Sequence, residues 1–173
     1  DDSSLDTALL LLAAPAVLAP ALLRLGNGEA PVAPDPGLGH AADILGSVIH
    51  ETLVRVRYGE VDRMGVVYHA NYLAYFETGR TEFLRHLGRS YRAVEEGGML
   101  LVVADAGLRF HRPAGYDDEL RVRTRLVELS GVRLRFEYEV ERPADGTLVA
   151  TGHTTLASTD PSGRPMRLPA ALR

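Results

Sequence analysis

Residues 132–142 alternate strictly between apolar and charged side chains, and no other feature of the chain constrains its fold as tightly. Successive side chains of a β-strand point to opposite faces of the sheet, so each set has a face of its own. The apolar face carries Val132, Leu134, Phe136, Tyr138 and Val140, and the charged face carries Arg133, Arg135, Glu137, Glu139 and Glu141. The pattern predicts an antiparallel strand with one buried side and one side in water.

One long helix and four further strands are predicted around this segment. Apolar side chains recur at helical spacing over residues 72–87, with Asn71 as the expected N-cap and Gly88 just past the end. Runs bounded by turn residues predict strands over 52–58, 99–110, 119–129 and 147–158. One strand, one helix and a four-strand antiparallel meander predict an α+β fold with the helix on one sheet face. Gly79 in the middle of the helix predicts a close approach to that sheet.

The hairpin loop around Ser130 sets the register of two neighbouring strands. A two-residue loop would place polar residues of one strand opposite apolar residues of the other. A three-residue loop with a left-handed bulge at Gly131 keeps the apolar sides together and sets Leu126 opposite Leu134. We therefore expect the bulged loop, which also pairs arginines of one strand with glutamates of the other.

The first quarter of the chain differs from the rest. Residues 1–45 are rich in Pro, Gly and Ala and predict an irregular N-terminal extension, followed by one domain over residues 46–173. Three interpretations of the extension stay open: a loosely packed segment, the tail of an upstream segment, and a targeting peptide. Its apolar stretch, residues 8–23, is broken by proline, and a membrane span needs about 20 apolar residues. No membrane span is therefore expected.

Composition argues against several kinds of site. The chain has no cysteine, which removes disulfides, thiolate catalysis and cysteine-bound metals. No two of its six histidines stand four residues apart, so no metal site is expected. The formal net charge of −4 gives no indication of nucleic-acid binding. A cytoplasmic location is the default expectation.

The segment 58–72, which reads YGEVDRMGVVYHANY, places the carboxylate of Asp62 in a glycine-bounded loop shortly before the predicted helix. A helix start offers unpaired backbone N–H groups and a partial positive charge. A carboxylate beside such donors suits attack on an acyl carbonyl, because the donors stabilise the oxyanion. The segment therefore predicts acyl-transfer chemistry, although an aspartate in a loop also often accepts local N–H bonds.

The same segment carries a family resemblance. Its core, Asp-x-x-Gly-Val-Val-Tyr-His-Ala-Asn-Tyr over residues 62–72, resembles the hot-dog-fold acyl-CoA thioesterases of the 4-hydroxybenzoyl-CoA thioesterase type. It is most similar to the bacterial branch associated with the Tol–Pal envelope system. Further matches at residues 113–118 and 164–169 extend the resemblance over residues 50–173. The resemblance implies a five-stranded antiparallel sheet wrapped around one long helix, and homodimers or tetramers with active sites at the subunit interface.

The resemblance also implies roles for individual residues. Asp62 falls on the family's catalytic aspartate, and His69 falls where a backbone N–H polarises the thioester carbonyl, with its imidazole as a possible helper. The expected substrate-binding residues are Gly65, Val66, Tyr68, Asn71 and Tyr72. Two residues depart from the family pattern: Gly79 stands where alanine is more common, and His111 replaces an aromatic residue. The second departure concerns the choice of acyl group.

The implied reaction is hydrolysis of an acyl-CoA thioester to a carboxylic acid and CoA, with no metal or redox cofactor. Asp62 would act either as nucleophile or as general base for water. The alternatives are an acyl-thioester hydratase or dehydratase and a non-enzymatic acyl-CoA-sensing module. The residues Arg121, Arg123 and Arg125 are expected to pair with glutamates on a solvated face, or else to contact the CoA nucleotide. A protein complex at the cell envelope is a further partner that the resemblance implies.

Overall fold

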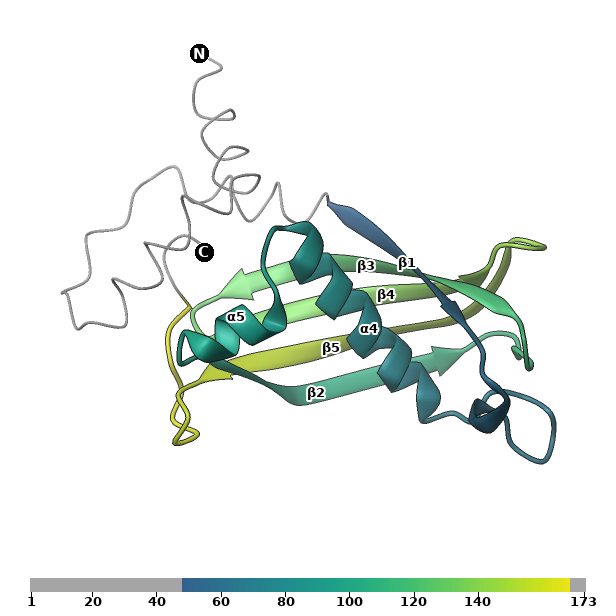
Figure 1. Cartoon of the computed structure of the whole chain (residues 1–173), viewed down its shortest axis with the longest axis horizontal. Helices are drawn as coiled ribbons and strands as arrows, with labels where there is room; N and C mark the ends of the chain where they lie inside the picture. Colours follow the sequence, from purple (N-terminus) through teal and green to yellow (C-terminus); the bar gives the residue numbers. More distant parts are fainter. Residues whose placement is uncertain (1–47, 169–173) are drawn as a thin grey trace, which may run out of the picture.

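The computed structural model describes residues 48–168, so the expected extension 1–45 lies outside the described residues. The elements are β1 (Ile49–Arg55), the 3₁₀ turn η1 (Tyr58–Glu60), α4 (Asn71–His86), α5 (Tyr91–Glu96), β2 (Leu100–Phe110), β3 (Glu119–Ser130), β4 (Arg133–Arg142) and β5 (Thr147–Thr159). The strands form one five-stranded antiparallel sheet, and α4 lies across one of its faces (Figure 1). The expected α+β hot-dog architecture, five strands around one long helix, is confirmed.

The order of the strands corrects the expected four-strand meander. The sheet runs β1-β3-β4-β5-β2, so only β3, β4 and β5 follow one another as a meander. β2 pairs with β5 at the far edge, and β1 takes the place beside β3. α4 has 16 residues and crosses the sheet from the end of β2, where Tyr72 meets Phe110, to the start of β1, where His86 stacks on His50 (Figure 1). The segment that contains α5 then leads the chain to β2 at the far edge.

The β3–β4 hairpin has a different register from the one expected. Leu126 lies opposite Phe136, two residues further along than predicted, and the loop consists of Gly131 and Val132. The bulged residue is Val127 in β3, although Gly131 does adopt a positive φ of 54°. A shift of two residues leaves every side chain on its original face. The alternation of apolar and charged residues therefore could not decide between these registers.

The apolar side of α4 packs into the sheet around a glycine. Phe76 and Phe83 are fully buried, and Phe76 stacks on Tyr138 of β4 with ring centroids 4.3 Å apart. Gly79 lies so close to β3 that a Cβ atom there would be 2.5 Å from Thr124 Oγ1. The expected close approach of helix and sheet is confirmed.

We expect Gly79→Ala to destabilise the protein although alanine is the better helix former. The gain in helix propensity is about 1 kcal/mol, whereas overpacking a core typically costs about 1–3 kcal/mol. The added methyl group would lie 3.0 Å from Val122 Cγ1 and closer still to Thr124, so two stiff side chains would have to move. Urea unfolding should show a lower midpoint for this variant, and no loss for Thr78→Ala at an exposed site of the same helix. A midpoint equal to that of the wild type would contradict this packing.

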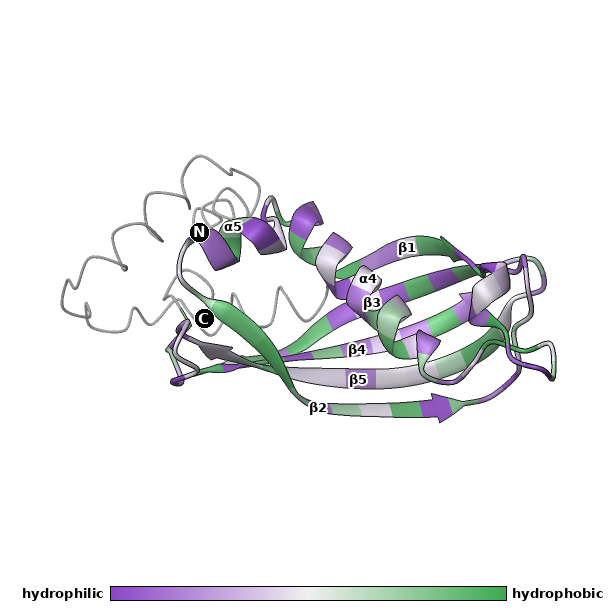
Figure 2. Ribbon diagram, turned by 60° about the horizontal axis from the view of Figure 1, so that its bottom comes forward, coloured by the Kyte–Doolittle hydropathy of each residue, from purple (hydrophilic) through white to green (hydrophobic). Residues whose placement is uncertain are grey.

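The face of the sheet away from α4 carries paired charges, which alternate with apolar residues along β3 and β4 (Figure 2). The ion pairs join Arg121 to Glu141, Arg123 to Glu51 and Arg125 to Glu137, with N···O distances of 3.7, 2.9 and 3.2 Å. The three arginines of β3 thus find carboxylates on neighbouring strands, as expected for a solvated face. Exposed pairs of this kind contribute at most about 1 kcal/mol each.

Candidate active site

The loop between η1 and α4 is closed into a tight turn by its own backbone. The N–H of Asp62 donates to the carbonyl of Val66 at 2.9 Å, and the N–H of Gly65 donates to the carbonyl of Asp62 at 2.9 Å. Gly65 has a φ of +76°, which residues with a side chain rarely adopt. The N–H of Val67 donates to the carbonyl of Ala114 at 2.8 Å, which ties the loop to the segment between β2 and β3. Gly65 therefore allows the backbone conformation of the turn that holds Asp62.

Asp62 combines a local contact with access to a cavity. Its Oδ1 accepts the N–H of Met64 at 2.7 Å, a turn contact that loop aspartates often make. Its second carboxylate oxygen has no hydrogen-bond partner among the described residues, and the side chain lines a cavity. One oxygen thus orients the carboxylate while the other stays available for chemistry.

The start of α4 corrects the role expected for Asn71. The N-cap is Ala70, which has helical backbone angles, and Asn71 is the first helical residue. The Asn71 side chain acts as a donor instead of a cap, because its Nδ2 donates to the carbonyl of Glu60 at 2.8 Å. The N–H of His69 has no hydrogen-bond acceptor in the described part of the chain. A free backbone donor therefore stands just ahead of the helix.

Asp62 and the start of α4 meet in a cavity of about 320 Å³. The expected site residues that line it are Asp62, Val66, His69 and Tyr72. The expected residues outside its lining are Gly65, Tyr68 and Asn71. The remaining lining residues, which were not assigned to the site from the sequence, are Met64, Val67, Phe110, His111, Arg112 and Pro113. Four of these residues lie at the end of β2 or just after it, far along the chain. Two of the four carried a sequence signal: His111 as a departure from the family pattern, and Pro113 as part of a match to it.

The walls of the cavity from α4 and β2 are partly aromatic and partly polar. Tyr72 is buried, and its ring meets that of Phe110 edge to face with centroids 5.3 Å apart. Burial raises the pKa of Tyr72, with a further contribution from the charge of Asp118, so the hydroxyl keeps its proton at neutral pH. His111 Nε2 lies 2.9 Å from Thr151 Oγ1, a contact that orients the imidazole. The cavity therefore offers both apolar surface and hydrogen-bonding groups.

Glu60, which was not assigned to the site from the sequence, joins the loop to the helix. Its buried carboxylate accepts the Tyr75 hydroxyl at 2.9 Å and the Nε of Arg57 at 2.7 Å. Its carbonyl accepts the N–H of Tyr68 at 2.8 Å and the Nδ2 of Asn71 at 2.8 Å. Burial opposes ionisation, but hydrogen bonds from Arg57 and Tyr75 outweigh it and keep the pKa of Glu60 below its ordinary value. The sequence carried no signal for this role, because a loop glutamate is usually exposed.

We expect Glu60→Gln to lower the thermal midpoint at neutral pH, because the buried charge-assisted hydrogen bonds are lost. Since the folded pKa is depressed, the contribution of Glu60 is fully present above its unfolded pKa of about 4.3. It is lost as the pH falls through the folded pKa, so the difference between wild type and variant should shrink below about pH 4. Circular dichroism melts between about pH 7 and pH 3 measure this difference. A difference in thermal midpoint that stays constant over that range would contradict a stabilising role of the ionised Glu60 carboxylate. An equal difference for the exposed control Glu96→Gln would contradict it as well.

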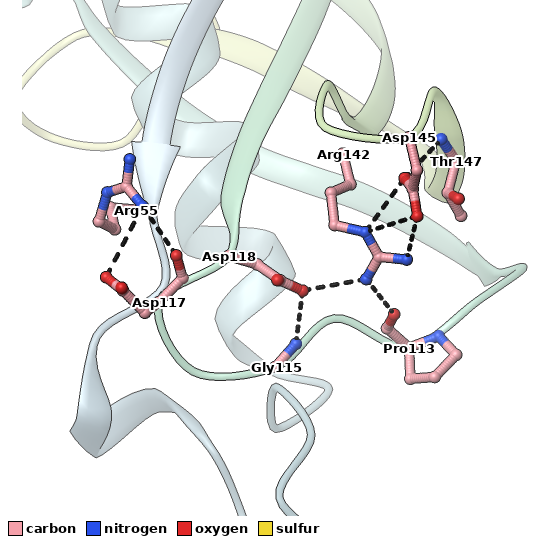
Figure 3. A network of polar contacts seen from close by, with 8 residues as sticks. All are labelled: Arg55, Pro113, Gly115, Asp117, Asp118, Arg142, Asp145 and Thr147. Atoms are coloured by element: carbon pink, nitrogen blue, oxygen red, sulfur yellow. Dashed lines mark hydrogen bonds and ion pairs between the residues drawn. The ribbon is translucent and has the colours of Figure 1, made fainter.

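The segment between β2 and β3 is held by a polar network (Figure 3). Asp118 Oδ2 accepts the N–H of Gly115 at 2.9 Å and the Nη1 of Arg142 at 3.0 Å. The same Nη1 lies 3.5 Å from the carbonyl of Pro113, which lines the cavity. Hydrogen bonds from Arg142 lower the pKa of Asp145 to about 2, so this network stays charged at neutral pH. It fixes the segment against which the Asp62 loop packs.

A larger hollow, about 750 Å³, lies on the outer face of the sheet and contains neither Asp62 nor His69. Its lining includes the ion pairs Glu51–Arg123 and Arg125–Glu137 and lacks the Asp62 carboxylate, so we place the reaction in the smaller cavity. Among residues 48–168, no three His, Asp or Glu side chains are grouped so as to hold a metal ion. Over the same range, no helix combines the length and apolar character that a membrane crossing requires.

Comparison with known proteins adds a family context. Residues 56–173 match the family model of the thioesterase-like superfamily. The chain is 34% identical over 120 residues to the acyl-CoA thioester hydrolase YbgC of Escherichia coli O157:H7, which covers 69% of this chain and 89% of that protein. It is 37% identical over 91 residues to the protein YneP of Bacillus subtilis strain 168, which covers 53% of this chain and 66% of YneP, just under two thirds.

A solved structure supports the same grouping. The DHNA-CoA thioesterase from Staphylococcus aureus matches with a TM-score of 0.67 at 32% identity. The match covers 69% of this chain and 80% of that one. The similarity in space therefore extends over most of the described sheet and helix.

Proposed function

Because the chain belongs to the thioesterase-like superfamily, we propose that it hydrolyses acyl-CoA thioesters to a carboxylic acid and CoA. One observation carries the proposal: the Asp62 carboxylate and His69, whose N–H is unpaired among the described residues, line the same cavity. A carboxylate can attack a carbonyl carbon or deprotonate water, and an N–H donor stabilises negative charge on the carbonyl oxygen. The names of YbgC and of the S. aureus enzyme point to the same reaction class.

In the general-base route, Asp62 takes a proton from water as the water oxygen bonds to the thioester carbonyl carbon. The carbonyl π electrons move to oxygen, where the His69 N–H stabilises the charge. The C–S bond breaks as the carbonyl reforms, and the proton held by Asp62 passes to the CoA thiolate. Asp62 is therefore ionised at the end of the cycle, as it was at the start.

In the nucleophilic route, the free oxygen of Asp62 bonds to the carbonyl carbon and expels CoA thiolate, leaving a mixed anhydride. Water then cleaves the anhydride, which releases the carboxylic acid and leaves a proton on Asp62. This proton passes to the CoA thiolate, which restores the carboxylate and gives the free thiol. The contact between Met64 N–H and Oδ1 of Asp62 leaves the other oxygen available in either route. We keep both routes in the proposal.

We further assign the chain to the 4-hydroxybenzoyl-CoA thioesterase type and to the branch associated with the Tol–Pal system. The motif over residues 62–72 and the similarity to YbgC support this assignment. In this proposal the protein is a cytoplasmic homodimer or tetramer that works without metal or redox cofactor and binds no nucleic acid. An envelope-associated protein complex is its proposed partner.

One alternative function has an observation in its favour. His111 and Asp62 line the same cavity, and an imidazole–carboxylate pair is what an acyl-thioester hydratase or dehydratase would use. The two reactions differ in the bonds that they change. A hydratase adds water to the acyl chain and leaves the C–S bond intact. Hydrolysis frees the thiol.

A panel of short, long and aromatic acyl-CoAs separates the possibilities. Free-thiol release, followed with a thiol-reactive dye, reports hydrolysis, and mass spectrometry of the products reports addition or loss of water in an intact thioester. We expect thiol release from at least one member of the panel. Binding without any chemical change would instead identify an acyl-CoA-sensing module and would refute the proposed hydrolysis.

A further inference from the structure

Two tyrosines pack against each other on the surface beside the Asp62 loop. Tyr58, in η1, is 79% exposed, and Tyr116, between β2 and β3, is 58% exposed. Their rings meet edge to face, with centroids 5.5 Å apart and planes inclined by 86°. Single exposed aromatic residues are common on protein surfaces, but two rings at a right angle form a corner in which each keeps a free face. This tyrosine pair therefore offers planar apolar surface that the fold itself does not use.

The backbone holds the tyrosine pair in place. The N–H of Val56 donates to the carbonyl of Asp118 at 2.9 Å, and the N–H of Asp117 donates to the carbonyl of Val56 at 3.0 Å. These bonds tie the chain beside one tyrosine to the chain beside the other. The side chain of Arg55 adds a third contact, because its Nη1 donates to the carbonyl of Asp117 at 2.8 Å (Figure 3). The pair is thus preformed, and a ligand loses little free energy in ordering it.

The tyrosine pair is close to the Asp62 cavity. Pro113 lines the cavity, and Tyr116 follows three residues later, so their Cα atoms are at most about 11 Å apart. Between them, Gly115 forms an isolated bridge with Val66, which also lines the cavity. The arm of CoA between its thiol and its nucleotide is pantetheine, which is longer than about three residues of extended chain. A thioester held at Asp62 can therefore place its nucleotide at the tyrosine pair.

Basic residues flank the tyrosine pair in the chain. Arg57 directly precedes one of the tyrosines, and its side chain is 81% exposed. Its Nε and Nη2 bind Glu60 at 2.7 and 2.6 Å, which leaves Nη1 available. Arg63, in the loop that leads to the cavity, is exposed and forms no ion pair within residues 48–168. The exposed carboxylate beside the pair, that of Asp117, already has Arg55 as its partner at 3.6 Å. Positive charge is therefore available next to the exposed rings.

We propose that the tyrosine pair binds the adenine of the CoA substrate and that Arg57 and Arg63 contact its phosphates. The choice of ligand rests on the acyl-CoA hydrolysis proposed above. Adenine stacks on one ring while its edge meets the other, because the two rings stand at a right angle. Such stacking needs no particular base edge, and an arginine matches a phosphate group in shape and charge. The site then selects CoA thioesters over thioesters of pantetheine or of carrier proteins, which have no adenine.

The larger hollow on the outer face of the sheet suits the nucleotide less well. Its Arg123 and Arg125 bind glutamates at 2.9 and 3.2 Å, so phosphates there would have to replace existing ion pairs. The tyrosine in its lining, Tyr138, is buried and offers no ring face to a base. The tyrosine pair, in contrast, presents exposed rings together with an arginine that has no carboxylate partner within residues 48–168.

Calorimetric titration of the full chain with CoA and with phosphopantetheine tests the site without catalysis. CoA should bind at least about tenfold more tightly, because only CoA carries the adenosine. Tyr58→Ala and Tyr116→Ala should each remove most of this difference, whereas Tyr58→Phe and Tyr116→Phe keep the aromatic ring and should retain it. Arg63→Ala should weaken CoA binding by a factor that shrinks at high salt, and the exposed control Arg92→Ala on α5 should not. Equal dissociation constants for the two ligands, or unchanged CoA binding in both alanine variants, would overturn the proposal.

Steady-state kinetics separate this site from the reaction itself. Tyr58→Ala and Tyr116→Ala should raise KM for an acyl-CoA and change kcat much less, because adenine is remote from the reacting bond. The same variants should leave KM for the matching acyl-phosphopantetheine unchanged. Adenosine-dependent CoA binding with no thiol release from any thioester would refute the hydrolysis while the nucleotide site stands. Thiol release with equal KM for acyl-CoA and acyl-phosphopantetheine would refute the nucleotide site alone.

Discussion

Asp62→Asn is expected to lower the turnover of acyl-CoA thioesters by about 100-fold or more, the loss typical of a principal acid–base or nucleophilic group. The amide has nearly the same shape, and its oxygen can still accept the N–H of Met64, so the turn should persist. It cannot supply the negative charge needed to attack a carbonyl or to accept a proton from water. KM should change much less than kcat, because the carboxylate acts mainly on the transition state. Free-thiol release over a range of substrate concentrations measures both.

The matched control makes the same carboxylate-to-amide change on the surface. Glu96→Gln, at the exposed end of α5, should turn over like the wild type. Both variants should unfold within about 0.5 kcal/mol of the wild type, as surface changes usually do. A folded Asp62→Asn variant with near-normal turnover would remove Asp62 from the proposed mechanism.

Two substitutions at His69 are expected to separate its backbone from its ring. His69→Ala keeps the N–H and should retain turnover within about tenfold, less than the loss of a general base. His69→Pro removes the N–H and should lower kcat by about 100- to 1000-fold, as for the loss of one oxyanion donor. The N–H has no acceptor among the described residues, so its removal breaks no hydrogen bond seen there. Steady-state thiol release on the same substrate gives both values.

Proline at position 69 also restricts the backbone of Tyr68, so the fold of that variant needs its own measurement. Its circular dichroism spectrum and thermal midpoint should match those of His69→Ala before the rates are compared. A large and equal loss in both variants would assign the role to the imidazole. A folded His69→Pro variant with normal turnover would exclude this N–H as the oxyanion donor.

The elements of the fold were predictable because their signals are local. The alternation along β4 shows directly in the burial of its residues, with Leu134, Phe136 and Tyr138 inside. The helix was predicted from the spacing of its apolar residues. Its close approach to the sheet at Gly79 was predicted because glycine lowers the stability of a helix interior and so needs a packing reason. The bounds of the first strand were predicted less accurately: it begins at Ile49 instead of position 52. Residues 49–51 show no clear alternation in the sequence, and pairing with β3 places them in the strand.

The residues of the candidate site also fall into two groups, those that a local motif predicted and those that only the fold brought to the cavity. Asp62 and His69 are seven residues apart in the chain, so a contiguous motif was enough to place both near a helix start. Phe110 and His111 join them in the cavity only because β2 ends there. Glu60 illustrates a different difficulty, since a carboxylate in a loop gives no local sign that Tyr75 will bury and bind it.

The sequence alone was sufficient for the faces of the strands, the single helix and the reactive loop. Each of these follows from the identity of residues within one turn or one strand length of each other. Strand order, the two-residue shift of the β3–β4 hairpin and the composition of the cavity emerged from the folded chain. Their physical cause is non-local: the neighbours in a sheet are chosen by contacts between segments far apart in the chain, and a shift by two residues leaves every side chain of a strand on its original face. The same holds for β2, whose place at the sheet edge beside β5 became visible only in the folded chain.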